Sequence, residues 1–460
     1  RRRSAWGTTT MHRSLRLIGR RCRDSSLMLL LASCAGGGGG SSPAPTAPSP
    51  SPPPPVINEK VSGLDFSPYL DGQSPDLGTP ISENQLTARM QLLVPLTRSV
   101  RTYSTTHGLE NAGKVAHTLG LNITVGAFLS ADAQQNALQA ANLIAAAKAG
   151  ETDDTVIVGS EVLERGDLSE TALIAELRQV RQALPATIRM GYADTAYQLL
   201  AHPAVVDEAD VVFANIYPYF DGVPIEQALR HVDFIFTRLQ AQVQPKTVML
   251  SETGWPTAGP QRGGAVPSAG NAATYFRNFT GWARAKHVEY FYFEAFDEAW
   301  KTAEGAQGPH WGILDSSGNL KTGMSAAFDG TAVTDTWNRS IPGGAGTAAL
   351  QFTAIPASGS TDNLRGQLTG VDPALYRIVT YICVDDLWYP KPSYASPTTY
   401  PGIDGNWTVD VTTGPMDETA TKIAAYVLPV AYRVAQVSAG TPNIPPEIET
   451  SAVAKREVMR

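Results

Sequence analysis

The sequence predicts an α/β fold, a (β/α)8 TIM barrel followed by a small C-terminal β-sandwich. Eight short β-rich segments alternate with segments of helical periodicity over about 250 residues, which is the size and order of such a barrel. Several of the β-rich segments are almost continuously apolar, as expected of parallel strands that are covered on both faces. Beyond residue 346, short alternating runs separated by turn residues predict the β-sandwich.

The eight β-rich segments are expected to be the barrel strands. The segments between them repeat apolar residues three and four positions apart, which is typical of amphipathic helices. One helix is expected within residues 82–97, where Ser82 and Gln85 have the spacing of a capping box, and another within residues 169–184. The strands are expected at residues 61–69, 99–106, 122–130, 155–163, 187–195, 209–219, 246–255 and 288–300.

The N-terminal segment is expected to lie outside the fold. A basic stretch precedes a short apolar run at residues 27–31, and small residues then lead to Cys34, which is the layout of an export signal. The letters "LASC" resemble a bacterial lipobox, which implies a lipoprotein-type signal peptide at residues 1–34 and a lipid anchor on Cys34. Residues 35–57 are rich in Gly, Ser and Pro and are expected to form a linker. This interpretation places the protein, exported and lipid-anchored, in a bacterial cell envelope; the alternative is an apolar patch beside a chance cysteine.

Composition and charge exclude several classes of partner. The chain has 36 Lys and Arg against 43 Asp and Glu, a net charge of −7, and its body has no dense basic stripe. A nucleic-acid partner is therefore disfavoured, and a neutral or weakly charged substrate is expected. Three cysteines (Cys22, Cys34 and Cys383) cannot build a disulfide framework or a metal cluster. The seven histidines are scattered and form no HExxH motif, so we expect no metal and no cofactor.

Two predicted strands end in glutamates that are candidates for catalysis. Glu161 ends the fourth strand and Glu252 ends the seventh. Active sites of (β/α)8 barrels lie at the C-terminal ends of the strands, so these carboxyls can face each other across the barrel mouth. A retaining glycosidase uses such a pair about 5–5.5 Å apart, one acid to protonate the leaving oxygen and one carboxylate to attack the anomeric carbon. Taken singly, either glutamate could equally be an exposed loop charge.

Five motifs occur in one order along the chain: "VGSEVL", "NIYPYFDG", "SETGWPT", "FEAFDEAWK" and "HWGILD". Together they resemble glycoside hydrolase family seventeen, the β-1,3-glucanases and β-1,3-glucanosyltransferases, over about residues 63–324. The resemblance implies a retaining mechanism on β-glucan, with Glu252 as nucleophile and Glu161 as acid/base. It also implies that Glu298 and Lys301 form a supporting charged pair near the catalytic acid.

The chain departs from the pattern of this clan at one position. An asparagine usually precedes the acid/base glutamate and hydrogen-bonds the sugar 2-OH, whereas this chain has Ser160 there. Such contacts strengthen in the transition state and can supply several kcal/mol. A serine hydroxyl is shorter, so we expect a slower enzyme rather than an inactive one.

Aromatic residues follow or end most of the predicted strands. Flat apolar sugar faces pack on such rings, so we expect Tyr103, Tyr217, Trp255 and Trp311 to contact substrate, although some of these rings could instead be core. The Tyr217 hydroxyl would also suit the nucleophile as a hydrogen-bond donor. Arg101 is expected to order the carboxylates rather than to touch sugar.

The C-terminal region is expected to form its own domain. The catalytic barrel is expected to span residues 58–330 and the β-sandwich residues 346–436, and "DGNWTVDVTTG" in it resembles accessory β-domains of bacterial carbohydrate-active enzymes. Residues 437–460 are polar and contain proline, so they are expected to be disordered. Four aromatic residues could bind polysaccharide or simply fill the core of the sandwich: Trp388, Tyr389, Tyr394 and Trp407.

Three functional hypotheses follow from the sequence. The first is a lipid-tethered retaining enzyme that hydrolyses or transglycosylates β-1,3-glucan through a covalent glycosyl-enzyme intermediate. The second is a catalytically weak or inactive glucan-binding lipoprotein of the same fold. The third is a mainly structural envelope lipoprotein whose barrel keeps a vestigial cleft.

Overall fold

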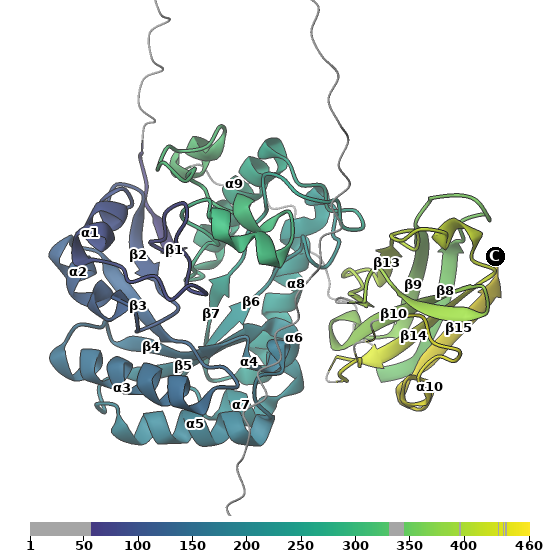
Figure 1. Cartoon of the computed structure of the whole chain (residues 1–460), viewed down its shortest axis with the longest axis horizontal. Coiled ribbons are helices and arrows are strands. Elements are labelled where there is room, and N and C mark those ends of the chain that lie inside the picture. The colour runs from purple at the N-terminus through teal and green to yellow at the C-terminus, as the bar shows by residue number, and fades with distance from the viewer. Residues whose placement is uncertain (1–56, 331–344, 395–396, 431, 436, 438) are drawn as a thin grey trace, which may run out of the picture. The chain divides into compact units, whose positions relative to one another are not determined.

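The computed structural model describes residues 57–330, 345–394 and 397–460, except residues 431, 436 and 438. Cys34, the predicted signal peptide and all but the last residue of the predicted linker lie outside the described residues. The described chain forms a parallel barrel surrounded by helices and, after it, two antiparallel sheets (Figure 1). Among these residues, no helix is both long enough and apolar enough to cross a bilayer.

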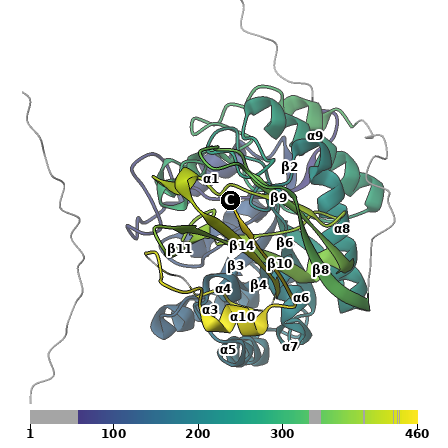
Figure 2. The same cartoon turned by 90° about the vertical axis from the view of Figure 1, so that its right-hand side faces the viewer.

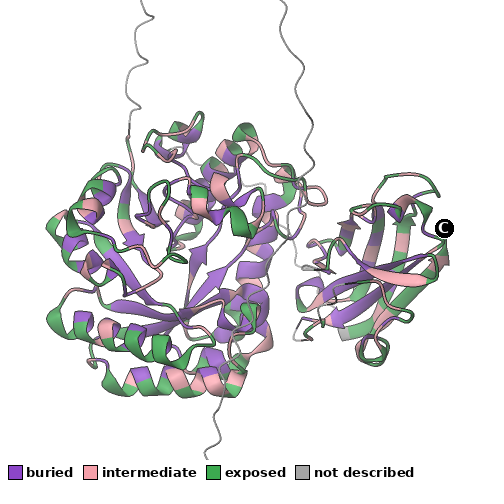
Figure 3. Cartoon of the chain, viewed as in Figure 1, coloured by how far each residue is buried: buried purple, intermediate pink, exposed green. Residues whose placement is uncertain are grey.

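Seven parallel strands form the barrel sheet and pair in the order in which they occur in the chain. Each overlaps one of the predicted strand segments, which confirms the barrel architecture. Their side chains are mostly buried, whereas the helices around them expose their outer faces (Figure 3). The strands are β1 (Val61–Asp65), β2 (Thr97–Arg101), β3 (Asn122–Ala127), β4 (Thr155–Ser160), β5 (Arg189–Thr195), β6 (Val211–Asn215) and β7 (Thr247–Glu252).

The eighth predicted strand, residues 288–300, closes the barrel without forming a continuous ladder. Tyr290 bridges to Leu250 of β7 and Tyr292 bridges to Leu64 of β1, both in parallel. Backbone hydrogen bonds from both neighbouring strands reach this segment, so it fills the eighth position of the barrel. The approach is close, since a Cβ added at Gly63 would lie 2.4 Å from the Phe291 ring.

Two of the helices that surround the barrel begin at a serine that caps the N-terminus. Ser82 accepts a hydrogen bond from the Gln85 N–H at the start of α1, as its spacing predicted, and Ser169 accepts one from the Ala172 N–H at the start of α5. Four short 3-10 helices occupy the connections at residues 109–111, 299–304, 308–310 and 324–328. The α-helices are α1 (Glu83–Gln91), α2 (Ala112–Thr118), α3 (Ala133–Ala149), α4 (Val162–Arg165), α5 (Glu170–Ala183), α6 (Ala196–Ala201), α7 (Pro203–Asp207), α8 (Ile225–Val243) and α9 (Ala269–Lys286).

The C-terminal region is a β-sandwich, as predicted, because one apolar core joins its two sheets. One sheet has the order β11-β10-β14-β15, with β12 beside β10, and the other has the order β13-β9-β8. Figure 2 shows β10, β11 and β14 of the first sheet and β8 and β9 of the second. Leu364 and Leu368 of one sheet share a core with Ile378 and Ile423 of the other. The strands are β8 (Ala345–Ala354), β9 (Leu364–Val371), β10 (Tyr376–Val384), β11 (Leu387–Lys391), β12 (Thr398–Thr399), β13 (Asn406–Val409), β14 (Lys422–Pro429) and β15 (Ala454–Met459).

The prediction of a disordered tail over residues 437–460 is wrong. The tail contains a short helix, α10 (Pro446–Ser451), and β15, which pairs antiparallel with β14. The strand is mostly polar, and only Ala454 and Val458 pack against the core of the sandwich, so the sequence carries little hydrophobic signal. Backbone pairing with β14 orders the segment instead, and no composition-based rule detects such pairing.

The aromatic residues of the sandwich have different environments. Trp407 is buried and packs edge-on against Phe352, so it fills the core rather than offering a sugar-binding face. Trp388 and Tyr389 are half-buried, and Tyr394 is exposed.

Candidate active site

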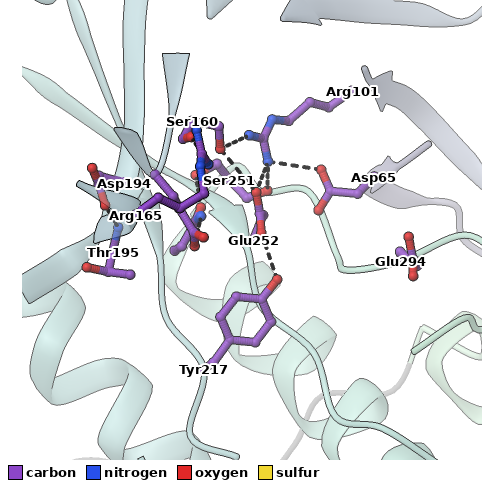
Figure 4. A network of polar contacts seen from close by, with 12 residues as sticks. Asp65, Arg101, Ser160, Arg165, Asp194, Thr195, Tyr217, Ser251, Glu252 and Glu294 are labelled. Carbon is purple, nitrogen blue, oxygen red and sulfur yellow. Dashed lines mark hydrogen bonds and ion pairs between the residues drawn. The ribbon is translucent and has the colours of Figure 1, made fainter. Parts of the chain in front are cut away.

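Polar side chains from several barrel strands meet at the C-terminal ends of the strands in one hydrogen-bonded network (Figure 4). Within this network, two paths of hydrogen bonds and adjacent residues connect the side chain of Glu161 with that of Glu252. Asn215, the last residue of β6, donates to the Glu161 carboxylate at 2.8 Å and accepts from the Ser251 hydroxyl. Ser251 precedes Glu252 in β7, so this path runs from one glutamate to the other. Ser160 gives a second link, since its hydroxyl lies 3.4 Å from Glu252 Oε1.

Glu252, the last residue of β7, is buried and accepts hydrogen bonds on both carboxylate oxygens. Arg101 Nη1 donates to Oε1 and the Tyr217 hydroxyl donates to Oε2, each at 2.8 Å. An ionised carboxylate is an acceptor only, so two fixed donors hold it in one orientation. The geometry matches the supporting positions that the sequence suggested for Arg101 and Tyr217.

Arg101, the last residue of β2, is buried, and its guanidinium bonds to residues of three other strands. Its Nη1 also contacts Asp65 Oδ1 of β1 at 3.2 Å and the Ser251 carbonyl of β7 at 2.8 Å. Its Nη2 donates to the Ser160 hydroxyl of β4 at 3.0 Å. Burial raises the pKa of the Asp65 carboxyl above its ordinary value, against the opposing effect of Arg101. Arg101 lies closer to Glu252, at 2.8 Å, than to Asp65, at 3.2 Å.

Glu161 occupies a different environment from that of Glu252. It directly follows β4, is half-buried, and has a left-handed backbone with φ of 53°. Desolvation raises its pKa to about 8, and the negative charges of Glu252 and Asp194 add to this, while the hydrogen bond from Asn215 acts in the opposite direction. Glu161 therefore keeps its proton near neutral pH, as a general acid must.

Asn215 is a site residue that the sequence reasoning missed. It is the first residue of the motif "NIYPYFDG" and the last residue of β6. Its position could have identified it, because a polar side chain at the C-terminal end of a barrel strand faces the site. Its amide bridges Glu161 and Ser251 in the structure.

Two of the four predicted sugar-binding aromatics are not accessible to substrate. Trp255 is 1% exposed, packs against Tyr219 and Tyr275, and donates its indole N–H to the Val266 carbonyl at 3.1 Å. Trp311 is 2% exposed and lies behind Tyr217, with ring centroids 5.4 Å apart. Position after a strand could not distinguish them from mouth residues, because tertiary contacts, among them the packing of both indoles against Tyr219, bury them.

The other two predicted aromatics remain at the mouth. Tyr217 and Tyr103 are both half-buried, and the Arg101 guanidinium lies 4.5 Å from the centroid of the Tyr103 ring. Two further rings, which the sequence reasoning did not single out as contacts, are more open. Phe220, after β6, is 43% exposed, and Phe128, after β3, is 39% exposed.

Glu298 and Lys301 form the ion pair that the resemblance implied, with a third member. Lys301 Nζ lies 2.8 Å from Glu298 Oε2 and also contacts Glu294, and all three side chains are buried. The cluster belongs to the segment that pairs with β1 and β7, whereas Glu161 follows β4 on the opposite side of the barrel. The cluster therefore adjoins the strand that ends in Glu252, and its position near the catalytic acid stays a prediction.

Within the part of the chain that the structure describes, no group of three His, Cys, Asp or Glu side chains could hold a metal ion. The arrangement instead consists of one carboxylate held by donors and one carboxyl held protonated. A (β/α)8 barrel with such a pair after β4 and at the end of β7 has the layout of glycosidases that work with two carboxylates.

Comparison with known proteins gives the family. The profile of the BtgE/BtgC glycoside hydrolase domain matches residues 63–312, more than half of the chain. The chain belongs to this family of glycoside hydrolase domains. This membership confirms the predicted glycoside hydrolase domain, while the lipoprotein signal and the bacterial origin stay predictions.

Named relatives are similar over the barrel. "Glucan 1,3-beta-glucosidase" of Saccharomyces cerevisiae is 30% identical over 275 residues, which are 55% of this chain and 88% of that protein. "Probable glucan endo-1,3-beta-glucosidase btgC" of Aspergillus fumigatus is 27% identical over 294 residues, 57% of this chain but only 42% of that protein. A family 17 β-1,3-glucanosyltransferase of Rhizomucor miehei superposes with a TM-score of 0.51 at 27% identity, covering 57% of this chain and 96% of that one. An active-site mutant of the Rhizomucor enzyme has been solved with laminaritriose.

Proposed function

We propose that this protein is a retaining glycosidase that hydrolyses or transglycosylates β-1,3-glucan. The observation that carries the proposal is the unequal pair of carboxyls, with Glu252 held by Arg101 and Tyr217 and Glu161 held protonated. The names of the relatives in yeast, Aspergillus and Rhizomucor support β-1,3-glucan as the substrate.

The first chemical step forms a covalent sugar ester. A Glu252 oxygen attacks the anomeric carbon while Glu161 transfers its proton to the glycosidic oxygen, so the bond to the leaving sugar breaks without release of an alkoxide. Arg101 and Tyr217 donate to the carboxylate and orient it for this attack.

The second step reverses the role of Glu161. Once Glu252 is esterified its negative charge is gone, and that charge is one of the causes of the raised Glu161 pKa. The pKa of Glu161 therefore falls, and the deprotonated carboxylate can take a proton from the incoming nucleophile. Water gives hydrolysis and a sugar hydroxyl gives transfer, and both act on the same intermediate.

The principal experiment compares the enzyme with its Glu252→Gln variant on laminarin. We expect the parent to release reducing sugar or to form longer products, with the product masses showing the ratio of hydrolysis to transfer. Glu289→Gln is a matched control, because Glu289 is exposed and lies at the other end of the barrel, where it contacts Ser62. Equal product release by the parent and Glu252→Gln would end the proposal.

A second candidate function is a weak or inactive glucan-binding protein of the same fold. Ser160, at the position where an asparagine is expected, is the observation that favours it. The structure gives Ser160 a role that does not require substrate, since its hydroxyl bridges Arg101 and Glu252. Laminarin that binds to the protein but is not turned over would support this candidate.

We also propose that the protein is exported and anchored to a cell envelope through Cys34. The support is the sequence "LASC" after a basic and apolar leader, followed by the Gly- and Pro-rich segment. Cys34→Ser should move the protein from the membrane fraction to the soluble fraction of cells. An unchanged membrane fraction for Cys34→Ser would contradict the lipid anchor.

A further inference from the structure

The turn that carries Glu161 has an unusual backbone. Gly159 and Glu161 both adopt positive φ, 82° and 53°, and the pairing of β4 with β5 shifts register between Ile157 and Ser160. A glutamate rarely adopts this conformation, so the surrounding structure must hold it. A bulge of this kind at a strand end turns a side chain in a new direction. The glutamate that it turns here is the candidate acid.

Asp194 of β5 is the central contact of this turn. It is 0% exposed, and its Oδ2 accepts from the Leu163 N–H at 3.2 Å, two residues after Glu161. Oδ1 accepts from the Thr195 N–H at 2.8 Å, and the Tyr192 hydroxyl donates to Oδ2. The neighbouring Ala193 carbonyl accepts from the Glu161 N–H at 2.9 Å. The end of β5 therefore holds the turn at the Glu161 N–H and again at the Leu163 N–H.

Arg165 of α4 holds the same turn from its other side. Its Nη1 donates to the Ser160 carbonyl at 2.6 Å and its Nη2 to the Leu129 carbonyl at 2.9 Å. Figure 4 shows Arg165, Asp194 and Thr195 together on the Ser160 side of the network. Asp194 and Arg165 therefore both hold residues 160–163 in place through hydrogen bonds to the backbone.

Charged and polar groups from four elements face Glu161. They are Glu252 of β7, Asn215 of β6, Asp194 of β5 and Glu164 of α4. Burial raises the pKa of Asp194 to about 7, against three hydrogen bonds that favour its anion. The three donors to Asp194, which are the Leu163 and Thr195 N–H groups and the Tyr192 hydroxyl, all favour its ionised form.

We propose that Asp194 is a positioning residue for Glu161: it fixes the left-handed turn and places a buried negative charge beside the acid. Nothing in the reaction requires Asp194 to touch substrate. The inference rests on the proposed function of Glu161 as the acid. Asp194 affects the reaction only through Glu161, by setting the direction in which the Glu161 carboxyl points and the pH at which it loses its proton.

The test compares the parent enzyme with Asp194→Asn on two substrates, one whose leaving group must be protonated by the acid and one whose leaving group departs without a proton. Without the Asp194 charge, the pKa of Glu161 falls, so the basic limb of kcat/KM on laminarin should move about one pH unit lower. The rate on laminarin at neutral pH should fall about 10-fold. A 2,4-dinitrophenyl β-laminari-oligosaccharide needs no proton on its leaving group, so its kcat/KM should stay within about 2-fold.

A spectroscopic readout follows Glu161 without turnover. The infrared band of the protonated Glu161 carboxyl is the one that Glu161→Gln removes, and it should titrate at lower pH in Asp194→Asn. Asp194→Ser, which leaves room for a water, is measured in parallel so that misfolding of one variant does not end the test. Asp221→Asn is the matched control, because Asp221 is also buried and accepts a hydrogen bond from a tyrosine, Tyr197, but is not one of the groups that shift the pKa of Glu161. The basic limb of Asp221→Asn should not move.

Three outcomes would overturn the inference. They are an unshifted basic limb and infrared titration in both Asp194 variants, an equal loss on both substrates, and a shift of equal size in Asp221→Asn. An inactive parent enzyme is distinguishable from all three, because it refutes the proposed function and with it any positioning role.

Discussion

The two glutamates of the site lie in contrasting regions of one barrel mouth. At the end of β7, a guanidinium and a phenol donate to Glu252, and the buried Lys301 cluster lies in the adjoining segment. After β4, Glu161 meets one neutral amide and three carboxyl groups, and its pKa rises to about 8. The same side chain thus becomes a carboxylate held by donors in one region and a proton-bearing acid in the other. Environment, rather than residue type, assigns the two roles.

The largest effect should come from removing the acid itself. Glu161→Gln should lower kcat/KM on laminarin by about 10³-fold, because the leaving oxygen loses its proton donor. The loss should be much smaller on a 2,4-dinitrophenyl glycoside, and added azide should yield a glycosyl azide, since the Glu252 ester still forms. Steady-state kinetics on both substrates checks this, and equal losses on the two would break the contrast between the regions.

Next in size is the loss of the cation that holds Glu252. Arg101→Met leaves Asp65 and Glu252 buried without their shared partner, so we expect about 3 kcal/mol less stability. Thermal or urea unfolding of parent and variant measures the difference. Arg178→Met is the control, because Arg178 forms an exposed pair with Glu208 and its loss should cost far less stability. Similar costs for the two variants would show that the buried network does not stabilise the barrel.

A smaller effect tests in which direction each neighbour shifts the pKa of Glu161. The parent should lose kcat/KM with an apparent pKa near 8 as pH rises, because Glu161 must be protonated. Asn215 favours the ionised form of Glu161, so Asn215→Ala should raise that pKa and move the basic limb to higher pH, opposite to the expected effect of Asp194→Asn. Tyr217→Phe touches Glu252 instead and should leave the limb in place. A basic limb that moves to lower pH in Asn215→Ala would contradict the assignment.

The smallest expected change is at Ser160. Ser160→Asn should raise turnover of laminarin a few-fold, because the longer amide can reach a sugar hydroxyl. The new side chain must also keep the contacts of the serine with Arg101 and Glu252, which limits the gain. Turnover measured at saturating laminarin decides the matter, and no gain would mean that Ser160 does not limit the rate.

Much of the barrel could be predicted from local sequence, because strand and helix patterns need only near neighbours. The same reasoning failed where distant segments decide the outcome. Trp255 and Trp311 follow strands as mouth residues do, yet both are buried, and both pack against Tyr219 of the connection after β6. The polar strand β15 is ordered by pairing with β14, and its composition gave no sign of that.

The sequence by itself determined the order of the elements and the placement of Glu161 and Glu252 at strand ends, because periodicity and strand polarity are local properties. Only the tertiary structure decided which glutamate is protonated. That depends on Arg101, Asn215 and Asp194, which come from three other strands and lie between 33 and 151 positions away from the carboxyls they affect. Burial changes the free energy of a charge, and burial is a property of the assembled barrel.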